Sequence, residues 1–339
     1  MKTDRIKILI IKPSSLGDVI HALPFLKAIK NTFPQAHVEW VVSKGCEGVL
    51  AGNPLIDELI VFDKDSWKHP KDFSKTFREI KKLKRALSAK YFDMVIDLQG
   101  LLRTGLMAFL THSPLKIGFE HAREGSRFFY NKKVSVSKDI HAVDRYLEVA
   151  KAIGATTVTK EFPLYIDESA RDNIKKLLGD VGEYVVLVPS ARWETKRWPA
   201  EYFGLLVSKV SHPCIITGSD ADIKVAEEVM RVSNGKAINL CNKTNMKELI
   251  TLIAGSRAMV SNDSGPMHLG AALGIPLIAL FGPTDPERTG PYGWKENINF
   301  RVLRAGLSCS PCFKKKCKDP LCMSKISVEM VIEELKEYL

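Results

Sequence analysis

The chain has 339 residues, of which 45% are hydrophobic and 26% charged, and its formal net charge is +11. This length suits two domains of about 150 residues each. We find no long repeat or low-complexity tract, no stretch of the ~18 uncharged apolar residues that a membrane span needs, and no signal peptide. We therefore expect a soluble, globular protein of the cytoplasm.

The positive charge is concentrated in the first half of the chain. Residues 1–165 hold 27 lysines and arginines against 18 aspartates and glutamates, and ten of these basic residues lie in Lys64–Lys90. This surplus predicts an anionic partner, although a merely solvated helix face is an equal alternative. Nucleic acid is disfavoured because no helix-turn-helix, zinc finger or aromatic RNA-binding motif is present. The apolar residues of this region have helical spacing and predict one buried stripe: Phe73, Phe77, Ile80 and Leu87.

Strand-like and helix-like segments alternate along the chain with short connections, which favours parallel sheets covered by helices. The expected strands are Ile6–Ile11, Val38–Val42, Leu59–Val61, Met94–Leu98, Tyr184–Val188, Cys214–Thr217, Ala258–Val260 and Leu277–Phe281. The expected helices include Val19–Thr32, Arg78–Leu87, Val143–Ile153, Asp222–Val232 and Met246–Ala254.

The polar, Pro-containing stretch at Ala155–Ser169 predicts a domain boundary. We expect an α/β protein with two Rossmann-like, doubly wound domains, 1–165 and 166–322, facing each other across a cleft. A C-terminal helix within 323–339 is expected to pack back on the first domain. Ligands of such sheets bind outside the carboxyl ends of the strands, so we look for function in the loops there.

The loop after the first expected strand, Lys12–Asp18, holds one glycine. It therefore lacks the G-x-G-x-x-G dinucleotide fingerprint, which weakens a nicotinamide-enzyme interpretation. Asp18 enters the first turn of the next helix, where the helix dipole favours an ionised carboxylate. Such a carboxylate is a plausible general base, and the alternative is a helix-terminal acid without chemistry.

Three further loops at strand ends are rich in polar residues. One is Asp97–Arg103. In the next, Pro189–Pro199, Arg192 or Lys196 could neutralise a diphosphate, although its two tryptophans are equally consistent with a packing lid. The last is the Asp263 loop, Asn262–Pro266.

The Asp263 loop precedes a helix-length segment, and Pro266 suits the first turn of a helix. The free N–H groups of that turn, with Ser264 and Gly265, predict an anion site, and His268 lies one step inside it. The alternative is an ordinary strand–helix turn capped by Asp or Ser.

The seven cysteines divide into two groups. Isolated, buried thiols are expected at Cys46, Cys214 and Cys241. Four thiols lie close together in the sequence and have the spacing of a structural zinc site, with reduced thiols or a disulfide as the alternatives: Cys309, Cys312, Cys317 and Cys322. We therefore do not predict a bound zinc ion, and we expect no catalysis at these residues.

Several of these blocks, taken in order, resemble one family. From the first strand to about Gly293 the chain is similar to the lipopolysaccharide heptosyltransferases of glycosyltransferase family 9. The resemblance rests on Lys12–His21, Asp97–Gly100, Thr195–Pro199, Asp263–His268 and Phe281–Asp285. The segments Ala122–Glu124, Phe129–Asn131 and His141–Arg145 are most similar to the heptosyltransferase I branch.

The resemblance implies a GT-B fold and an inverting transfer of heptose from ADP-heptose to the Kdo-lipid A inner core. It assigns the general base to Asp18 and implies neither a metal nor a cofactor. The donor residues that it implies are Ser190, Arg192, Lys196, Asp222, Asp263, Ser264, Gly265 and His268. The acceptor residues that it implies are Ser14, Ser15, Arg123, His141 and Arg145.

The anionic lipid acceptor further implies peripheral attachment to the cytoplasmic face of the inner membrane, and no nucleic acid. Two alternatives stay open at this point. One is a heptosyltransferase II-type enzyme that adds a later core heptose. The other, from a different class, is a basic module that binds anionic lipid or nucleic acid.

Overall fold

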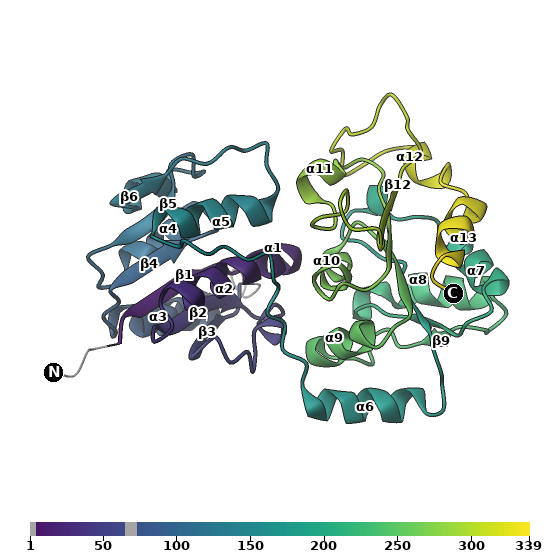
Figure 1. Ribbon diagram of the computed structural model, residues 1–339, viewed down its shortest axis with the longest axis horizontal. Helices are drawn as coiled ribbons and strands as arrows, with labels where there is room; N and C mark the ends of the chain where they lie inside the picture. Colours follow the sequence, from purple (N-terminus) through teal and green to yellow (C-terminus); the bar gives the residue numbers. More distant parts are fainter. Residues whose placement is uncertain (1–4, 65–72) are drawn as a thin grey trace. The chain divides into compact units, whose positions relative to one another are not determined.

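The computed structural model describes residues 5–64 and 73–339, except for the side chains of residues 73–75. The chain divides into two compact units, Met1–Tyr165 and Ile166–Leu339 (Figure 1). The division lies inside the stretch that the sequence analysis selected as a boundary. Each unit is an α/β structure built on a six-stranded parallel sheet, so the predicted fold class is confirmed.

The first unit has the strand order β3-β2-β1-β4-β5-β6. Its inner strands β1 and β4 are almost continuously buried, as expected for a parallel sheet that helices cover on both faces. Its strands are β1 (Lys7–Ile11), β2 (His37–Ser43), β3 (Glu58–Phe62), β4 (Met94–Asp97), β5 (Lys116–Phe119) and β6 (Lys132–Val134). Its helices are α1 (Leu16–His21), α2 (Leu23–Thr32), α3 (Phe73–Ser88), α4 (Leu102–Phe109) and α5 (Ala142–Ala152), with short 3-10 turns η1 (Glu47–Val49) and η4 (Ser126–Phe129).

The second unit has the strand order β12-β11-β10-β7-β8-β9. Its strands are β7 (Val185–Val188), β8 (Cys214–Ile216), β9 (Ile238–Asn239), β10 (Ala258–Asn262), β11 (Leu277–Leu280) and β12 (Phe300–Leu303). Its helices are α6 (Glu168–Leu178), α7 (Ala200–Lys209), α8 (Ile223–Val232), α9 (Met246–Ala254), α10 (Gly265–Ala272), α11 (Pro286–Thr289), α12 (Leu321–Ser324) and α13 (Val328–Lys336), with 3-10 turns η5 (Glu194–Lys196) and η6 (Asp220–Asp222).

The two sheets have the same topology. In each one the first strand of the unit, β1 or β7, lies in the middle and pairs with the second and the fourth strand of that unit. The direction of winding therefore reverses between β1 and β4, and again between β7 and β10. Doubly wound sheets bind their ligands at these switch points, outside the carboxyl ends of the strands. The four polar loops of the sequence analysis follow these four strands.

Helices cover both faces of the first sheet (Figure 1). On one face, Leu87 of α3 and Met107 of α4 pack on sheet residues such as Leu9, Val41 and Val95 in one buried cluster. Helices α1, α2 and α5 contact one another and form the other layer. The outer surfaces of α3 and α4 therefore belong to the same layer of the unit.

The apolar stripe predicted for α3 is wrong in part. Leu83 and Leu87 are buried, whereas Phe77 is 62% and Ile80 45% exposed. The side chain of Phe73 lies outside the described residues. Leu83 and Leu87 are four residues apart, so they lie on one side of the helix and contact the sheet there. The apolar face of α3 is wider than this contact, which leaves Phe77 and Ile80 exposed.

The helix predicted at 19–32 is two helices, α1 and α2, that meet at Ala22. Pro24 at the second position of α2 cannot donate a backbone hydrogen bond into a continuous helix, which accounts for the break. Strands β5, β6, β9 and β12 were not predicted. Three of these are edge strands of two to four residues, too short for a clear hydrophobic pattern.

The C-terminal helix α13 belongs to the second unit and packs in its core, and its packing on the first domain stays a prediction. It contacts α7 and β11, and Val331 and Leu335 are buried in the core of that unit. The indole of Trp198 donates to Ile326 O at 2.8 Å and fixes the segment just before α13. In the described part of the chain no helix has the length and apolarity needed to span a bilayer.

Candidate functional site

A buried lysine lies at the switch point of the first sheet. Lys12 directly follows β1 and is 2% exposed. Its ammonium lies 3.8 Å from Asp18 Oδ1, donates to Leu98 O at 3.4 Å, and sits 5.1 Å from the centre of the Tyr146 ring. Burial alone would lower the pKa of Lys12, but the carboxylate of Asp18 and the Tyr146 hydroxyl hold it above its usual value. Lys12 therefore supplies a fixed positive charge below the loop.

Asp18 stands at the third position of α1, as the sequence predicts, and its side chain is 40% exposed. Its Oδ2 accepts hydrogen bonds from the backbone N–H of Ser15 at 2.9 Å and from the Ser15 hydroxyl at 2.6 Å. This is a capping box, which also has a purely structural use. Lys12 beneath and the accessible position of Asp18 favour a reactive carboxylate over a simple cap.

The loop after β4 is held by a second buried carboxylate. Asp97 is 1% exposed and accepts from the backbone N–H groups of Gln99 and Gly100 and from the Tyr130 hydroxyl, the last at 2.6 Å. Burial raises the pKa of Asp97 in spite of these hydrogen bonds. The ring of Tyr130 lies against Gly118 of β5, where an added Cβ would come within 2.3 Å of it. Asp97 thus has a structural role in this loop.

The residues predicted to bind an acceptor lie on the loops around Asp18. Ser14 N donates to the side chain of Gln99 at 3.4 Å, and the backbone N–H of Arg123 donates to Gly100 O at 2.9 Å. His141 caps α5, and its ring stacks edge-on against His21 of α1 with centroids 4.8 Å apart.

Arg145 also belongs to this group. Its guanidinium lies 5.3 Å from the centre of the Phe119 ring, and its buried Nε has no hydrogen-bond partner among the described residues. The five predicted acceptor residues, Ser14, Ser15, Arg123, His141 and Arg145, are therefore on one edge of the sheet with Asp18.

The switch point of the second sheet contains a buried ion pair. Lys196 Nζ lies 2.6 Å from Asp263 Oδ2, with Asp263 5% exposed. The same oxygen accepts from the Thr284 hydroxyl at 2.5 Å, and Lys196 lies 4.8 Å from the centre of the Trp193 ring. The loops after β7, β10 and β11 therefore meet at one carboxylate. Lys196 is 16% exposed, which leaves its ammonium partly open to a ligand.

A second carboxylate links the loops after β7 and β8. Asp222 accepts from the Ser190 hydroxyl on one oxygen, and from the backbone and hydroxyl of Ser219 at 2.8 and 2.7 Å on the other. Burial would raise the pKa of Asp222, but these hydrogen bonds and the charge of Arg197 hold it below its usual value. An ionised Asp222 is thus well placed to accept from ligand hydroxyl groups.

The remaining predicted donor residues border this site. Ser264 is the N-cap of α10 in an extended conformation, its side chain makes no cap hydrogen bond, and Gly265 is the first helical residue. These features leave the first turn of α10 suited to an anion. His268 is 8% exposed within the same helix, and Arg192 is exposed on the loop after β7.

Sequence reasoning gave no role to Lys12, Tyr146 or Thr284. Lys12 and Thr284 stand inside the blocks that carry the family resemblance, which was the available signal. Tyr146 adjoins the predicted Arg145 but looks like an ordinary core residue in the sequence of α5. Its place above Lys12 depends on how α5 crosses the sheet.

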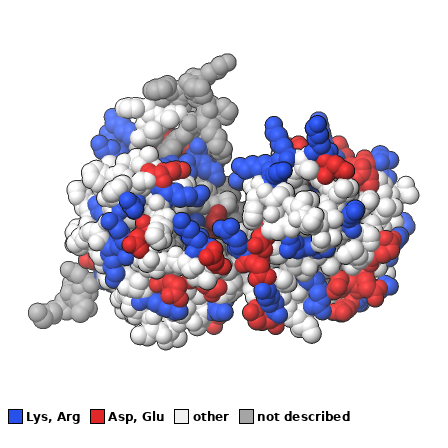
Figure 2. Space-filling model, turned by 90° about the horizontal axis from the view of Figure 1, so that it is seen from above, with Lys and Arg blue, Asp and Glu red and all other residues white. Residues whose placement is uncertain are grey.

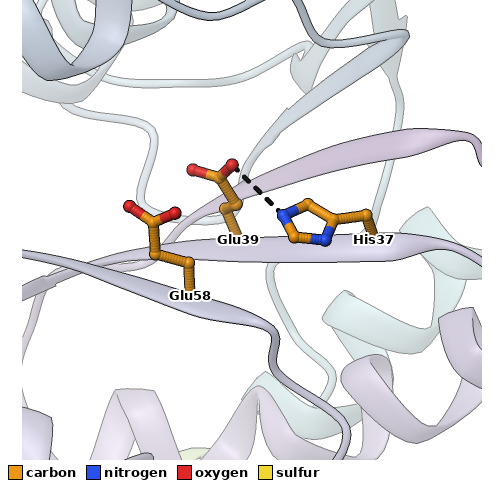
Figure 3. Close-up of side chains that lie close together, drawn as sticks. All are labelled: His37, Glu39 and Glu58. Atoms are coloured by element: carbon orange, nitrogen blue, oxygen red, sulfur yellow. Dashed lines mark ion pairs between the residues drawn. The ribbon is translucent and has the colours of Figure 1, made fainter.

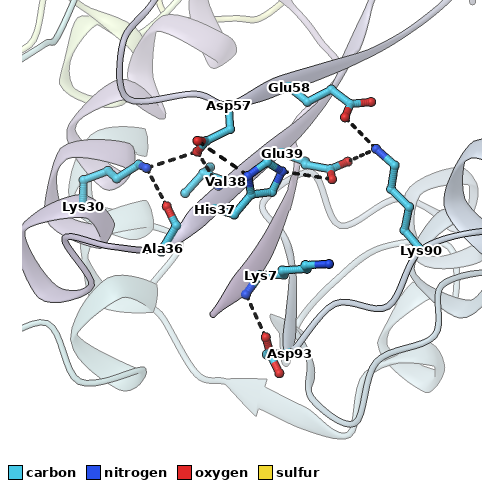
Figure 4. Close-up of polar contacts among 10 residues, drawn as sticks. All are labelled: Lys7, Lys30, Ala36, His37, Val38, Glu39, Asp57, Glu58, Lys90 and Asp93. Atoms are coloured by element: carbon cyan, nitrogen blue, oxygen red, sulfur yellow. Dashed lines mark hydrogen bonds and ion pairs between the residues drawn. The ribbon is translucent and has the colours of Figure 1, made fainter. Parts of the chain in front are cut away.

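One group of three metal-ligating side chains in the described ranges is close enough to share a cation: His37, Glu39 and Glu58, with ligand atoms within 4.8 Å of one another (Figure 3). The Lys90 ammonium, however, lies 2.8 Å from Glu39 and 2.7 Å from Glu58 (Figure 4). This ammonium pairs with both carboxylates, so we interpret the group as a structural ion network at the amino end of the sheet.

The four C-terminal cysteines, Cys309, Cys312, Cys317 and Cys322, do not form such a group. The first three are exposed. Their loop is anchored by backbone hydrogen bonds from Cys312 and Phe313 to Pro283 O and by the Thr195 hydroxyl to Lys314 O. Burial and the neighbouring thiols of Cys312, Cys309 and Cys317 raise the pKa of Cys322, so the four thiols gather in one region of this loop.

Comparison with known proteins assigns the family. The family model of glycosyltransferase family 9 (heptosyltransferase) matches residues 80–322. The match includes the loops after β4, β7 and β10 and leaves out β1 and the loop that follows it. The chain belongs to glycosyltransferase family 9. It is thus a glycosyltransferase, of the heptosyltransferase type found in the synthesis of the lipopolysaccharide core.

Relatives and solved structures of family 9 cover nearly the whole chain. Lipopolysaccharide heptosyltransferase 1 of Pseudomonas aeruginosa is 29% identical over 98% of this chain and 98% of its own. Lipooligosaccharide heptosyltransferase 2 of Campylobacter jejuni is 31% identical with the same coverage. The structure of the Escherichia coli heptosyltransferase WaaC with ADP has a TM-score of 0.81 at 27% identity, and covers 98% of this chain and 100% of its own. This likeness identifies the fold as GT-B.

Proposed function

We propose that this family 9 enzyme transfers a heptose from ADP-heptose to the Kdo-lipid A inner core with inversion at the anomeric carbon. The observation that carries the proposal is the exposed carboxylate of Asp18 above the buried ammonium of Lys12. Asp18 removes the proton of the acceptor hydroxyl while the oxygen of that hydroxyl attacks the anomeric carbon. The bond from the anomeric carbon to the diphosphate breaks at the same time. Nearby Ser14, Ser15, Arg123, His141 and Arg145 bind the acceptor.

The second switch point binds the donor in this proposal. The departing diphosphate gains negative charge, which the Lys196 ammonium and the N–H groups at the start of α10 stabilise. Asp222 accepts from the ribose hydroxyls. The remaining contacts come from Ser190, Arg192, Asp263, Ser264, Gly265 and His268. Two structures of the Escherichia coli heptosyltransferase WaaC, one with ADP and one with ADP-2-deoxy-2-fluoro heptose, support this choice of donor.

We assign the chain to the heptosyltransferase I type, which adds the first heptose. Support comes from the matched segments Ala122–Glu124 and His141–Arg145 and from relatives named heptosyltransferase 1. Relatives named heptosyltransferase 2 are 27–31% identical, so overall identity does not separate the two types. No metal or cofactor enters the proposed reaction.

The test is a turnover assay with ADP-heptose and two acceptors, Kdo-lipid A and its mono-heptosylated form. The proposal expects transfer to the first acceptor and at least about tenfold less to the second. The reverse preference would establish the heptosyltransferase II type. Absence of transfer to both would overturn the assigned donor or acceptor. We further propose that the enzyme works at the cytoplasmic face of the inner membrane as a peripheral protein.

A further inference from the structure

The layer of α4 and η4 on the first sheet exposes four large apolar side chains. Leu102 and Leu106 are each 43% exposed, Phe109 is 61% exposed and Phe128 is 73% exposed. We call these four residues the α4–η4 surface. The three residues of α4 stand four and three positions apart, so they form one stripe along its outer side. Contiguous apolar groups of this kind mark interaction sites on soluble proteins.

This surface belongs to a tightly packed part of the unit. A Cβ added to Gly105 of α4 would lie 2.7 Å from the Phe129 ring and 2.9 Å from Ser126, so η4 lies directly on the helix. The Phe109 and Phe129 rings are in contact with centroids 5.8 Å apart. The exposure of Phe109 and Phe128 therefore belongs to a built surface and not to a frayed chain end.

Each of the two phenylalanines of the α4–η4 surface has a cationic side chain beside its ring. The guanidinium of Arg127 lies 5.0 Å from the centre of the Phe128 ring, and the ammonium of Lys116 lies 5.7 Å from that of Phe109. Lysine and arginine can bury their stems along apolar surface while their charges reach a polar layer. Aromatic rings with basic neighbours suit the boundary between headgroups and acyl chains.

Helix α3 extends the same layer with further charge. It packs on the same sheet face as α4 through Leu83 and Leu87, and it exposes Phe77 and Ile80. In sequence its one acidic residue is Glu79. Among the residues of this helix whose side chains the structure describes, the exposed basic ones are Arg78, Lys81, Lys82, Lys84 and Arg85. Basic side chains also lie at several places over this unit on the face drawn in Figure 2.

We propose that the α4–η4 surface and the outer side of α3 dock on a bilayer that carries anionic headgroups. Apolar side chains enter the headgroup boundary while the basic residues pair with lipid phosphates. A second copy of the chain is disfavoured as the occupant, because two such faces would bring like charges together. The choice of a lipid partner rests on the proposed function; the surface itself follows from exposure and charge.

The test is co-sedimentation of the full-length protein with vesicles. One set contains phosphatidylglycerol and phosphatidylethanolamine, and the other contains only phosphatidylcholine. We expect at least about tenfold stronger binding to the anionic set at low salt. The double variant Phe109→Ser/Phe128→Ser should lose about tenfold in binding, because it removes the two most exposed side chains of the α4–η4 surface. A matched control, Leu205→Ser/Ile298→Ser, changes side chains that are 42% and 77% exposed in the second unit and should bind like the wild type.

Three results would overturn the inference: failure of the wild type to bind anionic vesicles, equal binding by the double variant and the control, or a concentration-dependent dimer that the double variant abolishes. Circular dichroism and melting temperature verify that both variants fold. Turnover with a delipidated Kdo acceptor separates this inference from the proposed function. If that turnover is normal and vesicle binding is absent, docking fails and the function stands. If vesicles bind and turnover is absent, the surface stands and the function fails.

Discussion

Lys12 Nζ and Asp18 Oδ1 lie 3.8 Å apart, yet the lysine is almost completely buried while the side chain of the aspartate is 40% exposed. The pair therefore directs a fixed positive charge at an accessible carboxylate. The carboxylate thus stays open to a ligand with a fixed cation beneath it, as a base at the edge of a sheet requires.

Lys12→Met should lower turnover roughly 10- to 100-fold, since one charge-assisted interaction contributes about 1.5–3 kcal/mol. In the wild type, the raised folded-state pKa of Lys12 stabilises the fold fully below the unfolded value of 10.5, and this contribution is lost as pH rises through the folded-state pKa. The difference in melting temperature between wild type and variant should therefore stay constant up to about pH 10 and change in favour of the Met variant only as the pH rises above 10.5. Lys44→Met, at an exposed lysine of the same unit, is the control. Equal turnover of the two variants would remove Lys12 from the site.

Asp18→Asn should retain ADP-sugar binding and lose roughly 10²–10⁴ in turnover, as expected for a lost general base. The amide keeps the shape of the carboxylate but cannot take up the proton. Calorimetry measures donor binding and a coupled ADP-release assay measures turnover. Asp139→Asn replaces another exposed carboxylate of the same unit and should be silent. Near-normal turnover in a folded Asp18→Asn protein would exclude Asp18 as the base.

Lys196→Ala should weaken ADP binding by about 1.5–3 kcal/mol, because a direct charge-assisted contact with the diphosphate is lost. It also leaves the buried carboxylate of Asp263 with the Thr284 hydroxyl as its remaining side-chain partner, so the melting temperature should fall. Lys316→Ala, at an exposed lysine, controls for general charge. An unchanged ADP affinity in calorimetry contradicts the assignment.

Neutralising Lys81, Lys82, Lys84 and Arg85 together should raise the apparent KM for the anionic acceptor and leave that for ADP-heptose nearly intact. All four are exposed on α3 and act through the general field of the first unit. The effect should shrink as added salt shortens the Debye length from about 10 Å at 0.1 M. Kinetics of the quadruple variant at low and high salt measure it. If the acceptor KM is unchanged at low salt, these residues have no part in acceptor binding.

Gly118→Ala should destabilise the first unit by about 1–3 kcal/mol, since the new Cβ would come within 2.3 Å of the ring of Tyr130, whose hydroxyl donates to Asp97. Denaturant unfolding measures the loss. Gly182→Ala, where an added Cβ meets nothing within 4 Å, is the matched control. A Gly118→Ala protein as stable as the control would mean that Tyr130 moves freely.

The local patterns of the chain predicted the inner strands except β5 and several of the helices, because continuous apolar runs such as Val185–Val188 and periodic ones such as Met246–Ala254 are strong signals. They failed where tertiary packing decides. Phe77 and Ile80 have the spacing of a core stripe, but the sheet meets α3 at Leu83 and Leu87.

The sequence predicted which loops form the candidate site, but it did not predict the side-chain contacts within the site. The order of polar blocks after strands indicated Asp18 and the Asp263 loop, and the topology accounts for their place at the two switch points. The buried position of Lys12, however, depends on contacts with Leu98 after the neighbouring strand β4 and with Tyr146 of helix α5. The burial of the Lys12 side chain therefore cannot be read from the sequence pattern.

The shared strand order of the two sheets also bears on how such an enzyme diversifies. The residues proposed to bind the acceptor stand on connections after β1 and β5 and at the start of α5, while the buried strands beneath them carry the stability of the unit. Substitutions in these connections can alter which sugar hydroxyl is accepted without disturbing the hydrophobic layers. Descendants of one ancestral gene can thus take up successive steps of one oligosaccharide assembly and still fold alike.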